Sequence, residues 1–312
     1  MTVERLAADI IDGIERVIVG KRAVAERLVV ALFARGHVLL DDVPGTGKTM
    51  MARAMAASTG LRFKRIQCTP DLLPGDVTGV NVFDPATTSF RFRPGPIFTD
   101  ILLADEVNRA TPRTQAALLE AMQETQVTVD GETRGLGEPF MVIATQNPVE
   151  FEGTFPLPEA QLDRFLMSLA VGYPSGEEEA GLVARMTGPH PVESIEPVVD
   201  GQSLVAAFEE VDAVHIAPEV AAYVVELVQR TRSSPALTLG ASTRASLALA
   251  SAARALASLR GRDFVLPDDI KELAPSVLAH RLIVDAEARL RGMDAGSILE
   301  GILEVQPVAG FD

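Results

Sequence analysis

The chain has 312 residues, of which 47% are hydrophobic, so it is long enough for one large domain or two moderate ones. Its formal charge of −15, from 28 basic and 43 acidic residues, argues against a protein whose main task is to grip nucleic acid, although a ring can be acidic outside and basic in its pore. A single cysteine excludes an intrachain disulfide framework, and with only four histidines it disfavours a dedicated metal-ligand cluster.

The sequence gives no sign of membrane or secretory targeting. It has no uninterrupted apolar run of about 18 residues, so we expect no membrane span. The first residues, Met1 to Arg5, lack the basic-then-apolar layout of a secretory signal. Tryptophan is absent and only two tyrosines are present, so stacking surfaces for bases are scarce. We therefore expect a cytoplasmic protein for which nucleic acid is a disfavoured partner.

The first part of the chain reads as helix, helix, strand, glycine turn and helix. Apolar residues recur at helical spacing over 2–18 and again over 22–35. Residues 37–40 form a short apolar run that is typical of a buried parallel strand. Glycines at 45–47 then precede a helix predicted over 50–58. A glycine loop between a strand and a helix is the context that a phosphate-binding loop needs.

The alternation of strands and helices continues up to about residue 171. Strands are predicted over 63–66, 101–104, 140–144 and 166–171, with a helix over 114–124. With the first strand this predicts an α/β fold in which a parallel five-stranded sheet lies between helices. Ligands of such folds bind at the carboxyl ends of the strands, where Asp42, Asp105 and Thr145 fall.

The composition changes near Tyr173, and the strand signals fade after it. We predict a nucleotide-binding α/β core over 1–173 and a smaller all-helical domain over 174–312. Ser242 and Asp268 are plausible helix N-caps. The helices are expected over 176–186, 202–210, 218–232, 242–260 and 268–280.

The run from Gly45 to Thr49 carries the strongest short motif. Glycines let the backbone amides turn inward at a helix start, where the helix dipole favours anions. Lys48 would reach the β- and γ-phosphates of ATP, and Thr49 would ligate Mg²⁺. Asp42 stands where the usual loop pattern has its first glycine. Because phosphates repel a carboxylate, the Asp42 side chain must turn away from them.

Two acids close the apolar run that begins at Ile101. Asp105 would hold Mg²⁺ and Glu106 would polarise the attacking water. Two acids after a strand are often merely solvated, but one crossover beyond a phosphate loop the catalytic interpretation is favoured. Asn147 follows the next strand, where it could orient the same water or simply start a turn before Pro148; both interpretations stay open.

Four longer stretches resemble the AAA+ ATPases and, within them, the MoxR family. They are Leu102–Ala110, Thr114–Met122, Ala144–Pro148 and Pro156–Phe165. The resemblance covers nearly the whole chain and implies a P-loop AAA+ core followed by a helical lid domain. It also accounts for Asp42, since an acidic residue at that position is familiar among MoxR-type sequences.

The resemblance implies roles that spacing alone does not. Gly45 to Thr49 matches the Walker A loop, and Asp105 and Glu106 match Walker B. Asn147 matches the first sensor, Arg164 the arginine finger that reaches a neighbour's nucleotide, and Arg244 the second sensor in the lid. On residues alone, both arginines could be ordinary surface side chains. The implied nucleotide contacts are Val19, Gly20, Pro44, Gly45, Thr46, Gly47, Lys48, Thr49, Met50 and Arg244.

Two insertions also resemble the family, as hairpins near 73–96 and 127–139 that face a pore in related machines. The resemblance implies a homo-oligomeric, hexameric ring that uses ATP and Mg²⁺ to remodel client proteins or to insert metals or cofactors into them. It further implies a partner with a von Willebrand factor A domain. A nucleic-acid-stimulated motor, a transcription-activating ATPase and a nucleotide-gated scaffold with little turnover are alternatives. Transcription-activating ATPases normally carry a Gly-Ala-Phe-Thr-Gly-Ala loop, and this sequence contains no such run.

Overall fold

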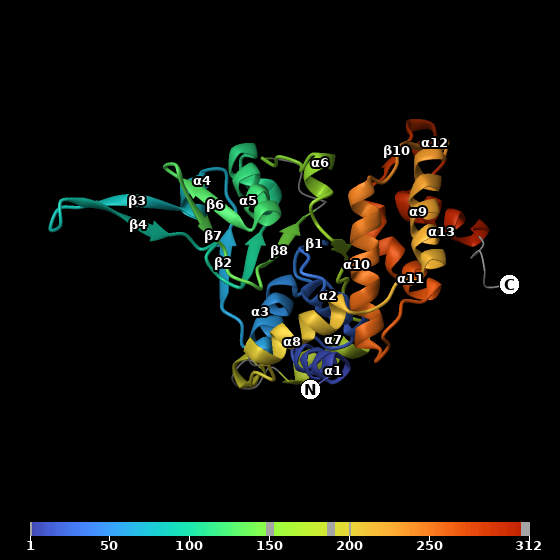
Figure 1. Ribbon diagram of the computed structural model, residues 1–312, viewed down its shortest axis with the longest axis horizontal. Helices are drawn as coiled ribbons and strands as arrows, with labels where there is room; N and C mark the ends of the chain where they lie inside the picture. The colour runs from blue at the N-terminus through green and yellow to red at the C-terminus, as the bar shows by residue number, and fades with distance from the viewer. Residues whose placement is uncertain (1, 148–152, 186–190, 200, 307–312) are drawn as a thin grey trace.

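The computed structural model describes residues 2–147, 153–185, 191–199 and 201–306. A parallel five-stranded sheet with helices on both faces lies beside a helical domain (Figure 1). The sheet order is β2-β5-β8-β1-β9, which confirms the predicted fold class. Its strands are β1 (Val38–Asp41), β2 (Phe63–Gln67), β5 (Ile101–Asp105), β8 (Met141–Gln146) and β9 (Met167–Leu169).

The central strands are buried on both faces because their side chains alternate between two apolar cores. On β5, Ile101 and Leu103 join the first core, whereas Leu102 and Ala104 join the second. The helices α1 (Val3–Glu15), α2 (Arg22–Phe33) and α3 (Lys48–Thr59) cover the first face. The second face is covered by α5 (Pro112–Glu124). This packing explains why the strands read as unbroken apolar runs.

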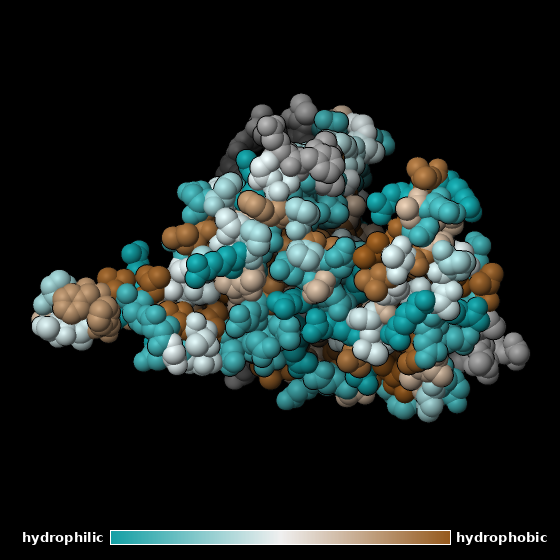
Figure 2. Space-filling view, turned by 90° about the horizontal axis from the view of Figure 1, so that it is seen from above, coloured by the Kyte–Doolittle hydropathy of each residue, from teal (hydrophilic) through white to brown (hydrophobic). Residues whose placement is uncertain are grey.

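Two antiparallel hairpins extend from the second face. The hairpin of β3 (Gly79–Asp84) and β4 (Ser89–Pro94) forms an arm that projects from the body, with Phe83 and Phe90 exposed on it (Figures 1 and 2). The second hairpin is shorter and pairs β6 with β7. The other elements of this part are α4 (Pro74–Thr78), β6 (Gln126–Val129), β7 (Glu132–Gly135), η1 (Val107–Arg109) and α6 (Glu159–Leu162).

The helical domain also contains a short antiparallel pair of strands, β10 and β11, which the all-helical prediction did not include. Its helix α10 begins after Ser242 as predicted, whereas α11 begins at Pro267, so Asp268 lies inside the helix and does not cap it. The elements are α7 (Gly176–Arg185), η2 (Pro191–Ser194), α8 (Gly201–Asp212), α9 (Pro218–Ser233), β10 (Leu237–Leu239), α10 (Thr243–Leu259), α11 (Pro267–Leu278), η3 (Ala279–Arg281), β11 (Ile283–Val284), α12 (Ala286–Leu290) and α13 (Ala295–Val305).

Across the described ranges, none of the helices is both long and apolar enough to cross a membrane.

Helices after residue 173 pack directly on the α/β core. The Phe208 ring of α8 meets the Phe33 ring of α2 edge to face, with 6.3 Å between the ring centroids. Arg35 donates to both carboxylate oxygens of Asp212 at 3.0 Å. The apolar core on the first face of the sheet therefore continues into the helical domain. The domain boundary near residue 173 stays a prediction.

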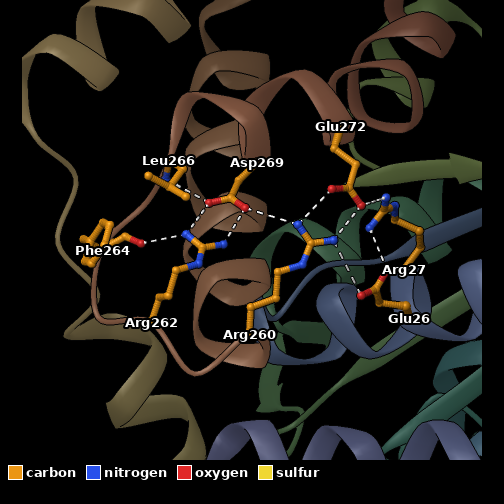
Figure 3. Close-up of polar contacts among 8 residues, drawn as sticks. All are labelled: Glu26, Arg27, Arg260, Arg262, Phe264, Leu266, Asp269 and Glu272. Atoms are coloured by element: carbon orange, nitrogen blue, oxygen red, sulfur yellow. Dashed lines mark hydrogen bonds and ion pairs between the residues drawn. The ribbon is translucent and has the colours of Figure 1, made fainter. Parts of the chain in front are cut away.

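A network of charged side chains ties α2 to the helical domain (Figure 3). Glu272 of α11 accepts hydrogen bonds from Arg260 at 2.8 Å and from Arg27 of α2 at 2.6 Å. The bond from Arg260 contributes most to lowering the pKa of Glu272 to about 2. Asp269, whose side chain is only 1% exposed, is paired with Arg262 at 2.6 Å. A carboxylate buried this deeply needs the compensating charge of the arginines, because an unpaired buried charge is strongly destabilising.

Candidate active site

A cavity of about 360 Å³ opens at the carboxyl edge of the sheet. It brings together the glycine loop, the two acids after β5 and the polar residues after β8, as expected for strand ends that share one edge. Its lining residues are Pro44, Gly45, Gly47, Lys48, Thr49, Met50, Asp105, Glu106, Thr145 and Asn147.

The glycine loop needs glycine for its backbone angles. Gly45 and Gly47 have φ values of +84° and +87°, which side-chain-bearing residues rarely adopt. A Cβ at Gly45 would meet nothing within 4 Å, so conformation and not crowding requires glycine there. Gly47 is the N-cap of α3, which starts at Lys48. Residues of this helix start line the cavity, and the unpaired amides of a helix start favour a bound anion.

Lys48 is held between two strand ends. Its Nζ donates to the backbone oxygen of Asp42 and, at 3.1 Å, to that of Gln146. Burial lowers the pKa of Lys48, while the nearby carboxylates, Asp42 first, act in the opposite direction. The ammonium is therefore positioned at the cavity by backbone contacts before any phosphate is present.

The Asp42 carboxylate turns away from the cavity, as its place in a phosphate loop predicted. One oxygen accepts from the amide of Val43 at 2.7 Å, and the other accepts from the amide of Gly172 at 2.5 Å. Gly172 lies just beyond β9, on the segment that leads into the helical domain. Asp42 thus avoids repelling phosphate and instead connects the glycine loop to that segment.

Asp105 and Thr49 provide oxygen ligands of the kind that Mg²⁺ prefers. Thr49 Oγ1 lies 3.5 Å from Asp105 Oδ2, and Thr145 donates to Asp105 Oδ1 at 2.6 Å. These groups fit a magnesium ion bound beside the phosphate loop. Arg65 of β2 lies 2.6 Å from the same Oδ2, so a cation there would share this oxygen with the guanidinium.

Glu106 is the cavity residue with an uncommon backbone. Glu106 lies between the end of β5 and the start of η1, and its φ is +56°. Its amide donates to Thr145 Oγ1 at 2.8 Å. The carboxylate accepts from Gln67 at 2.8 Å and from Arg109 at 3.1 Å. Such a backbone angle costs free energy, so the surrounding bonds fix where this carboxylate points.

Sequence reasoning missed the contribution of β2 to this site. Arg65 and Gln67 are two residues apart on one strand, so both side chains lie on the same face, opposite to the buried Ile66. That face lies over the two acids, because β2 pairs with β5 in a register that sets Gln67 beside Asp105. Polar residues at alternate positions of a strand next to an acidic strand end were the available signal.

The two arginines assigned by resemblance lie elsewhere. Neither Arg164 nor Arg244 is among the lining residues of the cavity. Arg244 lies 3.9 Å from Asp163, which also accepts from the Ser242 hydroxyl at 3.0 Å. The Nε of Arg164 is buried and has no hydrogen-bond partner among the described residues. Their roles stay predictions.

The remaining predicted nucleotide contacts lie close to the loop without lining the cavity. A Cβ at Gly47 would come within 3.3 Å of Ile18 Cδ1, so the segment before Val19 and Gly20 packs on the loop. Thr46 is buried, and its hydroxyl donates to Val43 at 3.3 Å. Their contacts with a nucleotide stay predictions.

The fold and the cavity define a P-loop ATPase of the AAA+ class. Residues 37–167 match the family described as ATPase family associated with various cellular activities (AAA), and residues 229–302 match the AAA lid domain. The chain is 53% identical to the uncharacterized protein YeaC of Bacillus subtilis, covering 96% of this chain and 93% of that one.

Two further comparisons specify the family. The chain is 42% identical to the chaperone MoxR1 of Mycobacterium tuberculosis, covering 96% of this chain and 83% of that one. It resembles the crystal structure of a candidate ATPase from Cytophaga hutchinsonii with a TM-score of 0.90 and 38% identity, covering 98% and 96% of the two chains. The chain belongs to the MoxR family of AAA+ ATPases.

Proposed function

We propose that this protein hydrolyses ATP at a site that a neighbouring copy completes, and uses the resulting movement to remodel client proteins. One observation carries the proposal: the cavity gathers Lys48, Asp105, Glu106 and Asn147, while the two arginines assigned to catalysis line no part of it. A transferring phosphoryl group needs positive charge close to its oxygens, which a lysine and a bound Mg²⁺ supply in part and an arginine commonly completes. We infer that this arginine comes from another surface.

Within the cavity, the loop amides from Gly45 to Thr49 and the Lys48 ammonium would hold the phosphates. Thr49 and Asp105 would hold Mg²⁺, which supplies charge neutralisation at the phosphate oxygens when bound. Glu106 would take a proton from the attacking water as that water bonds to the γ-phosphorus and the bond to ADP breaks. Asn147 would orient the same water, and Thr145 would keep both acids in place.

Arg164 and Arg244 would serve the neighbour's nucleotide. Arg164 follows Asp163 in the chain, and Arg244 lies 3.9 Å from the Asp163 carboxylate, to which Ser242 at the start of α10 also donates. We infer that this corner faces the cavity of the next subunit in a homo-oligomeric ring, with six subunits by analogy with the family. An arginine supplied in trans is worth about 10³ to 10⁵ in rate in phosphoryl-transfer enzymes. Turnover should therefore depend on assembly.

The client-level role rests on the family and on a chaperone-named relative. We propose a cytoplasmic machine that remodels or matures client proteins, or inserts a metal or cofactor into them, with a partner that bears a von Willebrand factor A domain. The net charge of −15 weighs against the alternative of a nucleic-acid motor. DNA-stimulated ATPase activity would favour that alternative, and unchanged function after Glu106→Gln would favour a scaffold.

The proposal is tested by measuring phosphate release and ATP binding for the wild type and Glu106→Gln. The wild type should hydrolyse ATP only with Mg²⁺, at a specific activity that rises with protein concentration as rings assemble. Glu106→Gln should bind ATP with nearly the same affinity but lose at least about 100-fold in kcat, since it lacks the base. Wild-type turnover in this variant would remove Glu106 from the reaction. In its ATP-bound form the variant should also retain client proteins for affinity capture.

A further inference from the structure

The segment that carries Arg164 is fixed by one buried arginine from the helical domain. The Arg281 side chain, at the end of η3, is only 3% exposed. Its Nε donates to Asp163 Oδ1 at 2.8 Å, and its Nη2 donates to Phe165 O at 2.6 Å and to Asp163 O at 3.3 Å. Its Nη1 donates to Leu166 O at 3.3 Å and to Val277 O.

These contacts use the whole hydrogen-bonding capacity of the guanidinium. An arginine has five N–H donors, and here each finds an acceptor. Four of the five acceptors belong to residues 163–166, on both sides of Arg164. His280 adds a further contact, with its Nε2 3.3 Å from Phe165 O. Arg281 thus fixes the backbone of this segment from a different part of the fold.

Arg164 itself presents the opposite case. Its backbone amide donates to Gln161 O at 3.2 Å, but its side-chain Nε has no acceptor among the described residues. All the donors of Arg281 are used, whereas the Nε of Arg164 is a buried donor without an acceptor among the described residues, a state that is rare in folded proteins and calls for an explanation. Arg281 therefore positions the segment 163–166, and Arg164 is the residue that this segment carries.

Resting on the proposed function, we propose that Arg281 and Asp163 form a clamp that positions Arg164 for the neighbour's nucleotide. The clamp is Arg281, Asp163 and the backbone of residues 163–166 that Arg281 holds. Through it, the helical domain sets where the finger points, because Ser242 at the start of α10 bonds to the same carboxylate. A movement of the helical domain would therefore change the positive charge offered to the next subunit.

The test uses Asp163→Asn, which keeps the carbonyl contacts of Arg281 and removes the charge that aligns its Nε. Arg281→Ala removes the whole clamp, but its loss of buried contacts can also weaken the fold. A matched control is Arg262→Ala, which breaks another buried ion pair of the helical domain, with Asp269, and touches none of residues 163–166. For each full-length variant, kcat, KM, ATP affinity and melting temperature are measured.

Asp163→Asn should lower kcat by about 10- to 100-fold, part of the range that an arginine finger supplies. Its ATP affinity and KM should stay within about threefold, because its own cavity is intact. Arg262→Ala should lose melting temperature but keep kcat. Mixing Asp163→Asn with Glu106→Gln subunits should restore turnover, since the second variant offers an intact finger to the intact cavity of the first.

Three outcomes overturn the clamp. If Asp163→Asn keeps the wild-type kcat, the ion pair does not position the finger. If an Arg164→Ala and Glu106→Gln mixture recovers turnover while the Asp163→Asn mixture does not, the finger acts in trans and only the clamp fails. If the Arg164→Ala mixture also fails to recover, the proposed function falls and takes the clamp with it.

Discussion

The candidate nucleotide cavity and the corner around Asp163 differ in the charges that they gather and in how their side chains are held. In the cavity, two carboxylates and a lysine are fixed by near neighbours: Asp105 by Thr145, and Glu106 by Gln67. At the corner, Asp163 is fixed by Arg281, while the side chain of Arg244 is 46% exposed and 3.9 Å from its nearest carboxylate. We propose that the cavity holds phosphates and metal and that the corner offers positive charge to the cavity of a neighbouring copy.

This comparison divides variants into two kinds. A change in the cavity should alter the binding of nucleotide by the same subunit. A change at the corner should leave that binding intact and alter only turnover.

The largest effect is expected for Lys48→Ala. The ammonium is pre-positioned by two backbone oxygens, and its loss removes charge-assisted bonds to phosphate. We expect ATP affinity to fall by at least about 100-fold, which is about 2.7 kcal/mol. Equilibrium titration with a fluorescent ATP analogue measures it. Lys64→Ala, which removes an exposed lysine of β2, is the control and should bind normally. Equal affinities of both variants would contradict the account of the cavity.

Arg244→Ala should produce the next largest effect, and on turnover alone. Because Arg244 does not line its own cavity, we expect kcat to fall by about tenfold or more and ATP affinity to change by less than about threefold. Arg291→Ala is a matched control, since that arginine is also in the helical domain and is 73% exposed. Steady-state ATPase assays and ATP titrations give both numbers. A large loss of affinity would mean that Arg244 contacts the nucleotide of its own subunit.

A smaller effect is expected for Asp42→Gly, which restores the usual glycine of the loop. The variant loses the bonds from Asp42 to the amides of Val43 and Gly172, so stability should fall by about 1 to 2 kcal/mol. ATP affinity should remain or rise slightly, because a negative charge near the phosphates is removed. Asp42→Asn, which keeps an acceptor, should lose less. Thermal unfolding of the three proteins measures the order of their stabilities, and an Asp42→Gly variant as stable as the wild type would refute the connecting role.

The smallest effect concerns the network between α2 and α11. The pKa of Glu272 is lowered to about 2 from 4.5, so its contribution to stability is present above pH 4.5 and is lost as pH falls toward 2. Glu272→Gln should therefore cost about 1 kcal/mol or less at pH 7, since the pair is partly exposed. The difference from wild type should shrink as the pH falls toward 2. Urea unfolding at pH 7 and at pH 3 measures it, and a difference that grew toward acid would have the wrong sign.

Much of the cavity could be predicted from the sequence because its parts are local. Buried strands appear as apolar runs, and polar residues such as Asp105 and Thr145 stand where those runs stop. The turning away of Asp42 followed from charge repulsion alone, and the structure confirms it.

The corner could not be predicted in the same way. Arg281 and Asp163 are separated by 118 positions in the chain, and no local pattern connects them. The same holds for Arg65 and Gln67, whose relation to the acids depends on the pairing of β2 with β5. The resemblance to the family pointed to Arg164 and Arg244 but not to Asp163, which precedes the first in the chain and lies 3.9 Å from the second.

The most direct test of the neighbour-completed site is to mix Arg164→Ala with Glu106→Gln subunits and to measure ATP hydrolysis. Each variant alone should be nearly inactive, because the first lacks the arginine finger and the second lacks the general base. The mixture should recover turnover at interfaces where a Glu106→Gln subunit offers its Arg164 to the cavity of an Arg164→Ala subunit. A mixture no more active than its components, although both bind ATP and assemble, would contradict the account.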